Sequence, residues 1–287
     1  MPAGLVRTIV KFNLVPAVLT GCAIHSFWLL PGPVSQRLII TGVFAVLLFY
    51  NLHRLVKLYT GAYDGLPALR TEYVASAYVL WTVVILSFFI TVLLGFDLFM
   101  RHWKLLFWAA LVAAIYAMPV LPSPHGLRSL REFPGGKGIV VAGVWSYTTA
   151  VLPVLIAGRA DWFDTPGSWI FLAARFLLFY VITGISDIRD VKNDPAHLNT
   201  VPQLIGVRNT IALYLFLVAV IMVMNVFTYL TGMLPLSRFV AYLLSNVLLA
   251  VLVVRSGRRQ PAWFYAILVD GLVVFQWIIW LFADLFF

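Results

Sequence analysis

Long apolar runs separated by short polar connections take up most of this 287-residue sequence. A membrane-spanning α-helix needs about 20 mostly apolar residues, and about nine runs meet or approach that length. Lipid offers no hydrogen bonds to the backbone, and the runs lack the alternation of barrel strands, so each run is predicted to be a helix. The predicted helices cover residues 14–30, 38–56, 73–95, 103–121, 138–158, 168–186, 210–231, 236–254 and 262–286. We therefore expect an all-α, polytopic membrane bundle that forms a single transmembrane domain over residues 1–287.

The composition excludes a water-soluble fold. Hydrophobic residues make up 62% of the chain and charged residues 11%, whereas soluble domains contain about 45–50% apolar and about 25% charged residues. A soluble protein of this length could not bury so much apolar surface. Membrane lipids are therefore the expected surroundings of most of the chain.

The basic residues indicate how the chain crosses the membrane. The formal net charge of +9 would suggest a nucleic-acid partner in a soluble protein, but here the basic residues lie in connections between apolar runs. Of the 20 Lys and Arg residues, fourteen fall in connections on one side and five on the other. Positive residues concentrate in cytoplasmic loops, so we expect a cytoplasmic N-terminus, an outer C-terminus and no nucleic-acid partner. The longest connections, at about residues 57–72, 122–137 and 187–209, then face the cytoplasm.

Two further features bear on the compartment. The chain has a single cysteine, Cys22, which excludes a disulfide framework and a CxxC metal site. Residues 1–13 carry few charges and the next run is long, so we expect no cleaved signal or transit peptide. A short N-terminus of this kind favours a prokaryotic plasma membrane.

The strongest candidate for chemistry is the acidic segment 184–206, which reads GISDIRDVKNDPAHLNTVPQLIG. Its aspartates, Asp187, Asp190 and Asp194, are spaced so that a continuing helix would place all three on one face. Like charges repel there unless a cation sits among them, and this density of carboxylates suits Mg²⁺ together with a substrate phosphate. A solvated loop, in which Arg189 and Lys192 compensate the acids, explains the spacing equally well.

The same segment resembles the second aspartate-rich motif of the UbiA-type intramembrane prenyltransferases. That motif runs D-x-x-D-x-x-x-D, then Gly, then Thr-Leu-Pro and Gly. The matching residues are Asp187, Asp190, Asp194, Thr200, Pro202 and Gly206, and positions similar to the family elsewhere are Tyr116, Pro119, Arg128, Tyr265, Asp270 and Gly271. The sequence departs from the motif before Thr200, where it is one residue shorter and carries His197 and Leu198. The resemblance implies a nine-helix bundle with aspartate-rich motifs on the cytoplasmic loops after helices two and six.

The first of those two motifs is missing. The matching stretch, residues 51–59, reads NLHRLVKLY, and it keeps Asn51 of the family's N-D-x-x-D-x-x-x-D. Leu52, Leu55 and Tyr59 stand where the family has three carboxylates. Two-metal binding of a diphosphate therefore cannot be inferred for this half of the site.

Basic residues remain in that stretch. Arg54 and Lys57 lie one helical turn apart, and such side chains bind phosphate oxygens. One hypothesis is that they replace a metal and hold the diphosphate against Mg²⁺ on the aspartates. The alternative is that they are ordinary membrane-surface anchors whose charged ends reach the lipid headgroups.

The resemblance implies a Mg²⁺-assisted transfer of a prenyl group from a polyprenyl diphosphate to a lipophilic acceptor in the membrane. The expected catalytic and metal-binding residues are Asp187, Asp190 and Asp194, and the expected diphosphate-binding residues are Asn51, Arg54, Lys57, Arg128 and Lys137. The alternative function is a non-catalytic isoprenoid- or lipid-binding membrane protein with the same fold. A transporter is less favoured, because we find no inverted repeat or matched pair of broken helices.

Two charged residues, Arg175 and Asp270, fall inside predicted spans. Charges at that depth are costly and usually face the interior of a bundle, often in pairs. A pair between these two residues is possible, and a structural role is favoured over a catalytic one.

Overall fold

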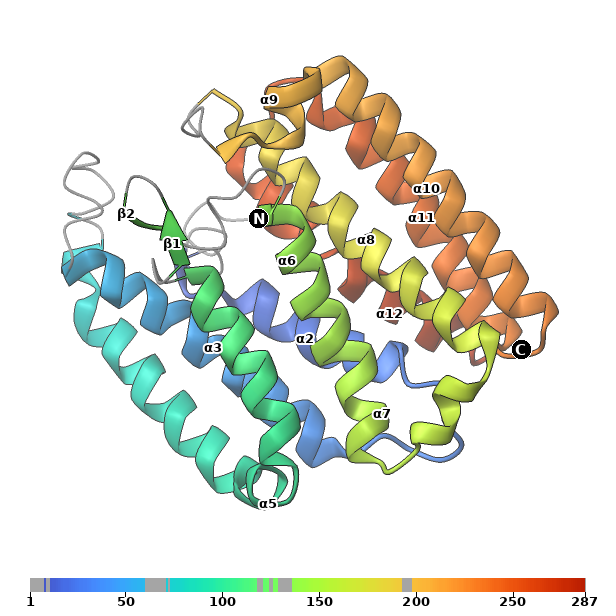
Figure 1. The fold of residues 1–287 in the computed structure, drawn as a ribbon, viewed down its shortest axis with the longest axis horizontal. Coiled ribbons are helices and arrows are strands. Elements are labelled where there is room, and N and C mark those ends of the chain that lie inside the picture. The colour runs from blue at the N-terminus through green and yellow to red at the C-terminus, as the bar shows by residue number, and fades with distance from the viewer. Residues whose placement is uncertain are drawn as a thin grey trace. The chain divides into compact units, whose positions relative to one another are not determined.

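The computed structural model describes residues 8, 11–59, 71, 73–117, 121–123, 126–128, 136–192 and 198–286 (Figure 1). In these residues the fold is helical apart from one short hairpin, in which β1 (Leu121–Ser123) pairs antiparallel with β2 (Gly126–Arg128). The α-helices are α2 (Leu14–Ser26), α3 (Gln36–Tyr59), α5 (Ala77–Ala117), α6 (Gly136–Ser146), α7 (Leu152–Ile156), α8 (Pro166–Asp190), α9 (Val201–Ile205), α10 (Val207–Leu230), α11 (Leu236–Ser256) and α12 (Leu272–Ala283). A π-helical turn, Tyr147–Val151, joins α6 to α7, a second, Phe264–Val269, precedes α12, and a 3-10 helix, Ala160–Asp164, precedes α8.

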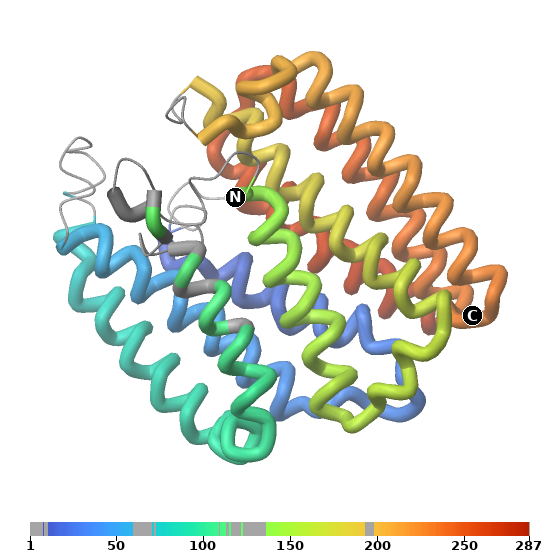
Figure 2. Tube along the Cα trace, in the orientation of Figure 1, coloured from blue at the N-terminus to red at the C-terminus, as the bar shows by residue number. Residues whose placement is uncertain are grey.

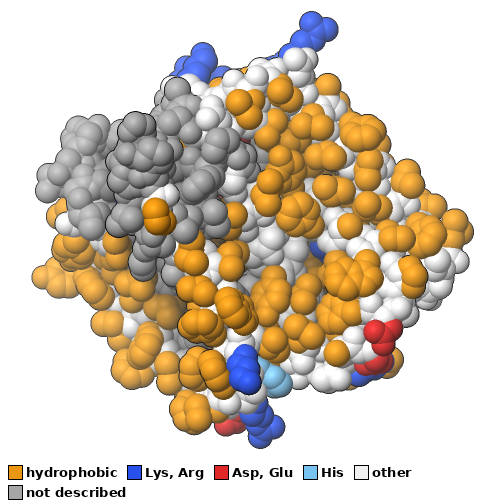
Figure 3. All heavy atoms as spheres, viewed as in Figure 1, with side chains coloured by type: hydrophobic (Ala, Val, Ile, Leu, Met, Phe, Trp, Pro, Cys, Tyr) orange, Lys and Arg blue, Asp and Glu red, His pale blue; other side chains and the backbone are white. Residues whose placement is uncertain are grey.

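Six helical segments of the described chain are long and apolar enough to cross a membrane. They are Gln36–Tyr59, Ala77–Trp108, Gly136–Ile156, Pro166–Asp190, Val207–Leu230 and Leu236–Ser256. Helices α2 and α12 are apolar but shorter, with 13 and 12 residues. The protein is therefore an integral membrane protein, as expected, and the count of nine spans stays a prediction. Hydrophobic side chains cover much of the face seen in Figure 3, where lipid would contact them.

The predicted helices 73–95 and 103–121 form one element, α5, with an interruption inside it. His102 has φ −124° and ψ 23°, which are not helical values, so α5 consists of two helical stretches on either side of this residue. Sharp breaks in helices have local causes of this kind. Hydropathy predicted a loop between these two helices. The structure has a single non-helical residue there, His102, instead of a loop.

The chain forms two compact units, and His102 lies at a boundary between them. The first unit contains Met1–Cys22 and Pro33–Arg101, and the second contains Ala23–Gly32 and His102–Phe287. In the first unit, Leu55 of α3 packs with Leu80 and Val84 of α5 in a small apolar core.

The second unit is built around α8. Helix α8 contacts α6 on one side and α10 on another, α10 packs against α11, and α11 packs against α12. The α8, α10 and α11 helices can be followed as neighbouring tubes in Figure 2. Pro166 stands in the first turn of α8, where a missing backbone N–H costs no intrahelical hydrogen bond.

An exposed ion pair lies in the turn before α8. Arg159 donates hydrogen bonds to both carboxylate oxygens of Asp161, at 2.9 Å and 3.2 Å from Nε. This pairing lowers the pKa of Asp161 and raises the pKa of Arg159. The two side chains are 43% and 60% exposed, so solvent screens the pair and it contributes little to stability.

Candidate functional site

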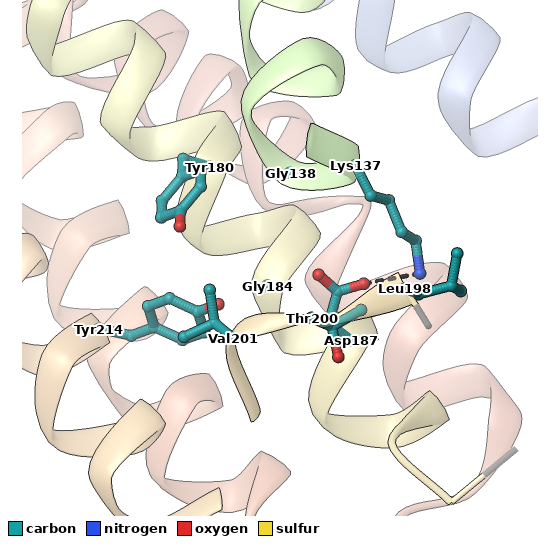
Figure 4. A pocket seen from close by; sticks show the side chains of 9 residues that line it. All are labelled: Lys137, Gly138, Tyr180, Gly184, Asp187, Leu198, Thr200, Val201 and Tyr214. Atoms are coloured by element: carbon teal, nitrogen blue, oxygen red, sulfur yellow. Dashed lines mark ion pairs between the residues drawn. The ribbon is translucent and has the colours of Figure 1, made fainter. Parts of the chain in front are cut away.

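The candidate site lies at the C-terminal end of α8, in the second unit. A small cavity there has a volume of about 10 Å³, which corresponds to roughly one water molecule. Its walls come from α6, α8, the connection before α9, α9 and α10 (Figure 4). The lining residues are Lys137, Gly138, Tyr180, Gly184, Asp187, Leu198, Thr200, Val201 and Tyr214.

An ion pair between α6 and α8 dominates this cavity. The ammonium of Lys137, in the first turn of α6, lies 2.6 Å from Oδ1 of Asp187, one turn before the end of α8. The side chains are 15% and 5% exposed, so both charges are largely removed from water. Removing one partner of such a pair leaves an uncompensated buried charge and is strongly destabilising. Lys137 and Asp187 are two of the residues predicted from the sequence, and the fold brings them together.

Two tyrosines form the apolar wall behind Asp187. The rings of Tyr180 and Tyr214 are nearly perpendicular, with an interplanar angle of 89° and centroids 6.1 Å apart. Each ring packs on a glycine: a β-carbon at Gly138 would lie 3.1 Å from the Tyr180 ring, and one at Gly184 would lie 2.2 Å from Tyr214. Small residues at helix contacts allow this close approach. Sequence reasoning missed both tyrosines, although Gly184, three residues before Asp187, was a usable signal.

The tail of the acidic segment has a structural role. Thr200 begins α9 with a capping box, in which its backbone N–H donates to Oε1 of Gln203 at 2.9 Å. Pro202 occupies the first turn of α9. Gly206 has φ +79°, a left-handed value that favours glycine, and it ends α9 and begins α10. The Thr, Pro and Gly matched to the family motif thus build the turn that brings Thr200 and Val201 to the cavity.

The second aspartate, Asp190, is engaged by its sequence neighbour. Arg189 donates to both carboxylate oxygens of Asp190, each at 2.7 Å. The Arg189 guanidinium also lies 4.9 Å from the ring centroid of Tyr265 and interacts electrostatically with Asp270. The third aspartate, Asp194, lies outside the described residues. The two described acids of the segment therefore each face a cationic side chain.

The donor set can be tested against Mg²⁺. Among the described residues, no three His, Cys, Asp or Glu side chains are grouped to hold a metal. Mg²⁺ does not need such a group, because it commonly takes one or two carboxylates together with waters and phosphate oxygens. The buried carboxylate of Asp187 already holds a cation, the Lys137 ammonium, so it fits a metal ligand in charge and location. Asp190 is not among the residues that line the cavity, and both of its carboxylate oxygens accept hydrogen bonds from Arg189.

No known protein family, curated protein or solved structure matches this sequence. A functional assignment therefore rests on the residues and their geometry.

The remaining predicted residues belong to other parts of the fold. Asn51 and Arg54 lie in the first unit, where they hold the start of α2. Asn51 is fully buried and donates to the carbonyl oxygens of Phe12 and Leu47, at 3.0 Å and 2.8 Å. Arg54 donates to the Lys11 carbonyl and, at 2.8 Å, to Oδ1 of Asn13.

These contacts give the polar residues of α3 a structural role. Asn13 has φ +54°, and the Asn51 and Arg54 side chains donate to the backbone carbonyls of Phe12 and Lys11, the two residues just before it. Leu55, at a position where the family has a carboxylate, is buried in the apolar core. Lys57 is half-buried in the last turn of α3. Arg128 lies in β2, and its side chain is outside the described part of the structure.

The two charges predicted to lie within spans do not pair with each other. Arg175 is 1% exposed and donates from Nη2 to Oδ1 of Asn225 at 2.7 Å. Its guanidinium carbon lies 4.2 Å from the ring centroid of Tyr242. Asp270 instead interacts electrostatically with Arg189. The structural role favoured for Arg175 agrees with these contacts, since they link α8, α10 and α11.

Proposed function

We propose that this protein is a UbiA-type intramembrane prenyltransferase, which transfers a prenyl group from a polyprenyl diphosphate to a lipophilic acceptor within the membrane. The observation that carries the proposal is the Asp187 carboxylate, buried in a cavity at the end of α8 and paired with Lys137. The acidic segment that resembles the family motif supplies Asp187, Thr200 and Val201 to that cavity. The apolar helices around it support a substrate that partitions into lipid.

The proposed reaction breaks the bond between the first carbon of the prenyl chain and the diphosphate oxygen. The bonding electrons leave with the diphosphate, and the allylic cation is captured by a nucleophilic atom of the acceptor, which then loses a proton. When bound, Mg²⁺ would supply Lewis-acid stabilisation of the departing diphosphate. Asp187, with Asp190 and Asp194, would hold that ion.

The other residues of the cavity support this chemistry in ways that need no metal. The Lys137 ammonium would stabilise negative charge that develops on the departing group. The rings of Tyr180 and Tyr214 would attract the allylic cation through their faces. A cytoplasmic N-terminus in a prokaryotic plasma membrane, with an outer C-terminus, completes the proposal and would place the cavity toward the cytoplasm.

The test is release of pyrophosphate from a panel of polyprenyl diphosphates by the full chain in nanodiscs, with and without Mg²⁺. We expect Mg²⁺-dependent release that falls about 100-fold or more in Asp187→Asn, as when one charge-stabilising group is removed from an active site. Asp161→Asn is the matched control, because it neutralises an exposed aspartate in the turn before α8, at the opposite end of that helix. Equal release by Asp187→Asn and wild type would contradict the assignment of Asp187.

One observation favours the second candidate, a non-catalytic isoprenoid- or lipid-binding protein. The cavity has room for about one water molecule, and both described aspartates of the segment pair with cations. A chain that had lost catalysis could retain these pairs as structural contacts. Tight binding of isoprenoid lipids, with no pyrophosphate release from any chain length, would support this candidate over the enzyme.

A further inference from the structure

We propose that the paired ends of α10 and α11 bind the headgroup of an anionic phospholipid, and that an acyl chain of this lipid lies along α11. The headgroup site is a basic patch of four arginines, one in the first turn of α10 and three at or just beyond the end of α11: Arg208, Arg255, Arg258 and Arg259. The inference does not rest on the proposed function, because none of these residues lines the cavity beside Asp187.

A close contact brings the two helix ends together. Helices α10 and α11 run side by side (Figure 2), and a β-carbon at Gly257 would lie 2.6 Å from a side-chain carbon of Ile211. Ile211 lies about one turn after Arg208, and Gly257 immediately precedes Arg258. The arginines of the two helices therefore share one end of this helix pair. Both helices are long and apolar enough to cross a membrane, so that end belongs at a membrane surface.

The positive charge of the basic patch is not compensated within its own segment. All four side chains are exposed, and residues 195–269 contain no Asp or Glu. In the described part of the chain, none of the four arginines forms an ion pair. The described acids nearest in sequence on either side, Asp190 and Asp270, both interact with Arg189. Charge complementarity thus favours an anionic ligand, and guanidinium groups bind phosphate oxygens through paired hydrogen bonds.

An exposed aliphatic row on α11 leads to the patch and points to a lipid. Its members follow one another at intervals of three or four residues, which places them on one face of the helix. They are between 48% and 56% exposed, and they are Leu244, Val247, Val251 and Val254. Arg255 continues this face one turn after Val251, and Arg258 follows just beyond the end of the helix.

The length of the row fits one leaflet of a bilayer. At 1.5 Å per residue, the ten residues from Leu244 to Val254 span about 15 Å, which is half of a hydrocarbon core of about 30 Å. Trp263, which is 47% exposed and follows the patch, is of a type that is enriched at the level of the headgroups. Row and patch together match the acyl chain and the headgroup of a phospholipid. A soluble phosphate compound would use the patch alone.

The experiment measures which lipid lies next to Val254. A bimane fluorophore is attached to Val254→Cys in the full chain carrying Cys22→Ala, and the protein is reconstituted into phosphatidylcholine vesicles. Phosphatidylglycerol or phosphatidylcholine with a spin label on the acyl chain is included at the same mole fraction as the quencher. We expect phosphatidylglycerol to associate at this position about fivefold more strongly than phosphatidylcholine, or more, since one basic residue near the surface attracts an anionic lipid by about that factor.

Substitutions show whether the arginines are the cause. Arg255→Gln/Arg258→Gln should reduce the preference to about one. Arg101→Gln/Lys104→Gln is the matched control, because it also removes two exposed basic residues three positions apart, in α5, and it should keep the preference at Val254. A bimane on Val226→Cys, an exposed position near the other end of α10, should report no preference.

Three outcomes would overturn the lipid site. The first is equal quenching by the two lipids at Val254, and the second is a preference that persists in Arg255→Gln/Arg258→Gln. The third is displacement of phosphatidylglycerol by inorganic pyrophosphate at an ionic strength matched with sodium chloride, which would show that the patch takes soluble phosphates. Each of them leaves the proposed function standing, because Asp187 and its cavity are unchanged. Absence of pyrophosphate release by wild type would in turn leave the lipid site standing.

Discussion

Tyr214 packs its phenol so closely on Gly184 that a β-carbon at position 184 would lie 2.2 Å from the tyrosine hydroxyl oxygen. The contact joins α10 to α8 one turn before Asp187, so it fixes the wall of the candidate site. The backbone at Gly184 has ordinary α-helical angles, so conformation does not require glycine there. Glycine is required because a larger side chain would collide with Tyr214. The same contact therefore controls both the packing of two helices and the shape of the cavity.

The first prediction is that Gly184→Ala destabilises the protein by about 1–3 kcal/mol, the usual cost of overpacking. The loss should outweigh the gain of up to about 1 kcal/mol that alanine brings to a helix interior. Thermal unfolding in detergent provides the measurement. Gly143→Ala in α6 is the matched control and should be neutral or stabilising. In the described part of the chain, no atom beyond its own helix backbone and its two chain neighbours lies within 4 Å of its β-carbon position.

A second substitution tests whether Tyr214 is the cause. Gly184→Ala combined with Tyr214→Ala should be less destabilised than the sum of the two single variants, because the clash no longer exists. Additive losses would mean that another neighbour limits the space at Gly184.

The second prediction concerns the buried bond between Arg175 and Asn225. Asn225→Leu should destabilise the protein by about 1.5–3 kcal/mol, because it removes the acceptor of a charged donor that is 1% exposed. Arg175→Met, which removes the charge as well, should rescue much of that loss when combined with Asn225→Leu. A double-mutant cycle of unfolding free energies measures the coupling, and a coupling near zero would contradict the bond.

The helices of this protein could be predicted from the sequence because lipid requires long apolar runs. The ends of those helices were harder to predict where polar residues continue the helix. Hydropathy ended the sixth helix at residue 186, whereas α8 continues to Asp190. Asp187 is buried within α8 because Lys137 compensates its charge. This partner lies 50 positions away in the sequence, so hydropathy along α8 could not reveal it.

The candidate site was predictable in residue type but only partly in geometry. The spacing of Asp187 and Asp190 predicted that both lie on a continuing helix, and both do lie in the last turns of α8. Two partners of Arg54 could not be predicted, because they are a backbone carbonyl and a left-handed asparagine, which leave no pattern in hydropathy. Tyr214 was also missed, since its importance depends on how α10 packs against Gly184.

The third prediction separates two roles of Arg54. If this residue only holds the start of α2, Arg54→Ala should speed amide hydrogen exchange near residues 11–14 and leave pyrophosphate affinity unchanged. Asn13→Ala is the matched control, because it removes the acceptor of the same hydrogen bond and keeps the charge of Arg54. Loss of pyrophosphate binding in Arg54→Ala but not in Asn13→Ala would show that Arg54 binds the diphosphate directly.

The fourth prediction concerns the path of the chain through the membrane. Because α8, α10 and α11 each have the length and hydropathy of a span, the turns that flank them should alternate between the two sides. Single cysteines can be placed in a Cys22→Ala background and labelled with a membrane-impermeant maleimide in vesicles of known orientation. Cysteines at the exposed residues Ala160 and Thr231 should be labelled from the outside, and one at Arg258 from the cytoplasmic side.

A cysteine at Leu285 extends this test to the last helix, which decides part of the predicted count of nine. The α12 helix has 12 residues, too few to cross a bilayer alone, but the π-helical turn Phe264–Val269 precedes it and lengthens the apolar segment. If the two together span the membrane, Leu285→Cys should be labelled from the same side as Ala160→Cys. Labelling from the side of Arg258→Cys would mean that this segment turns back inside the bundle and that the chain crosses one time fewer than predicted.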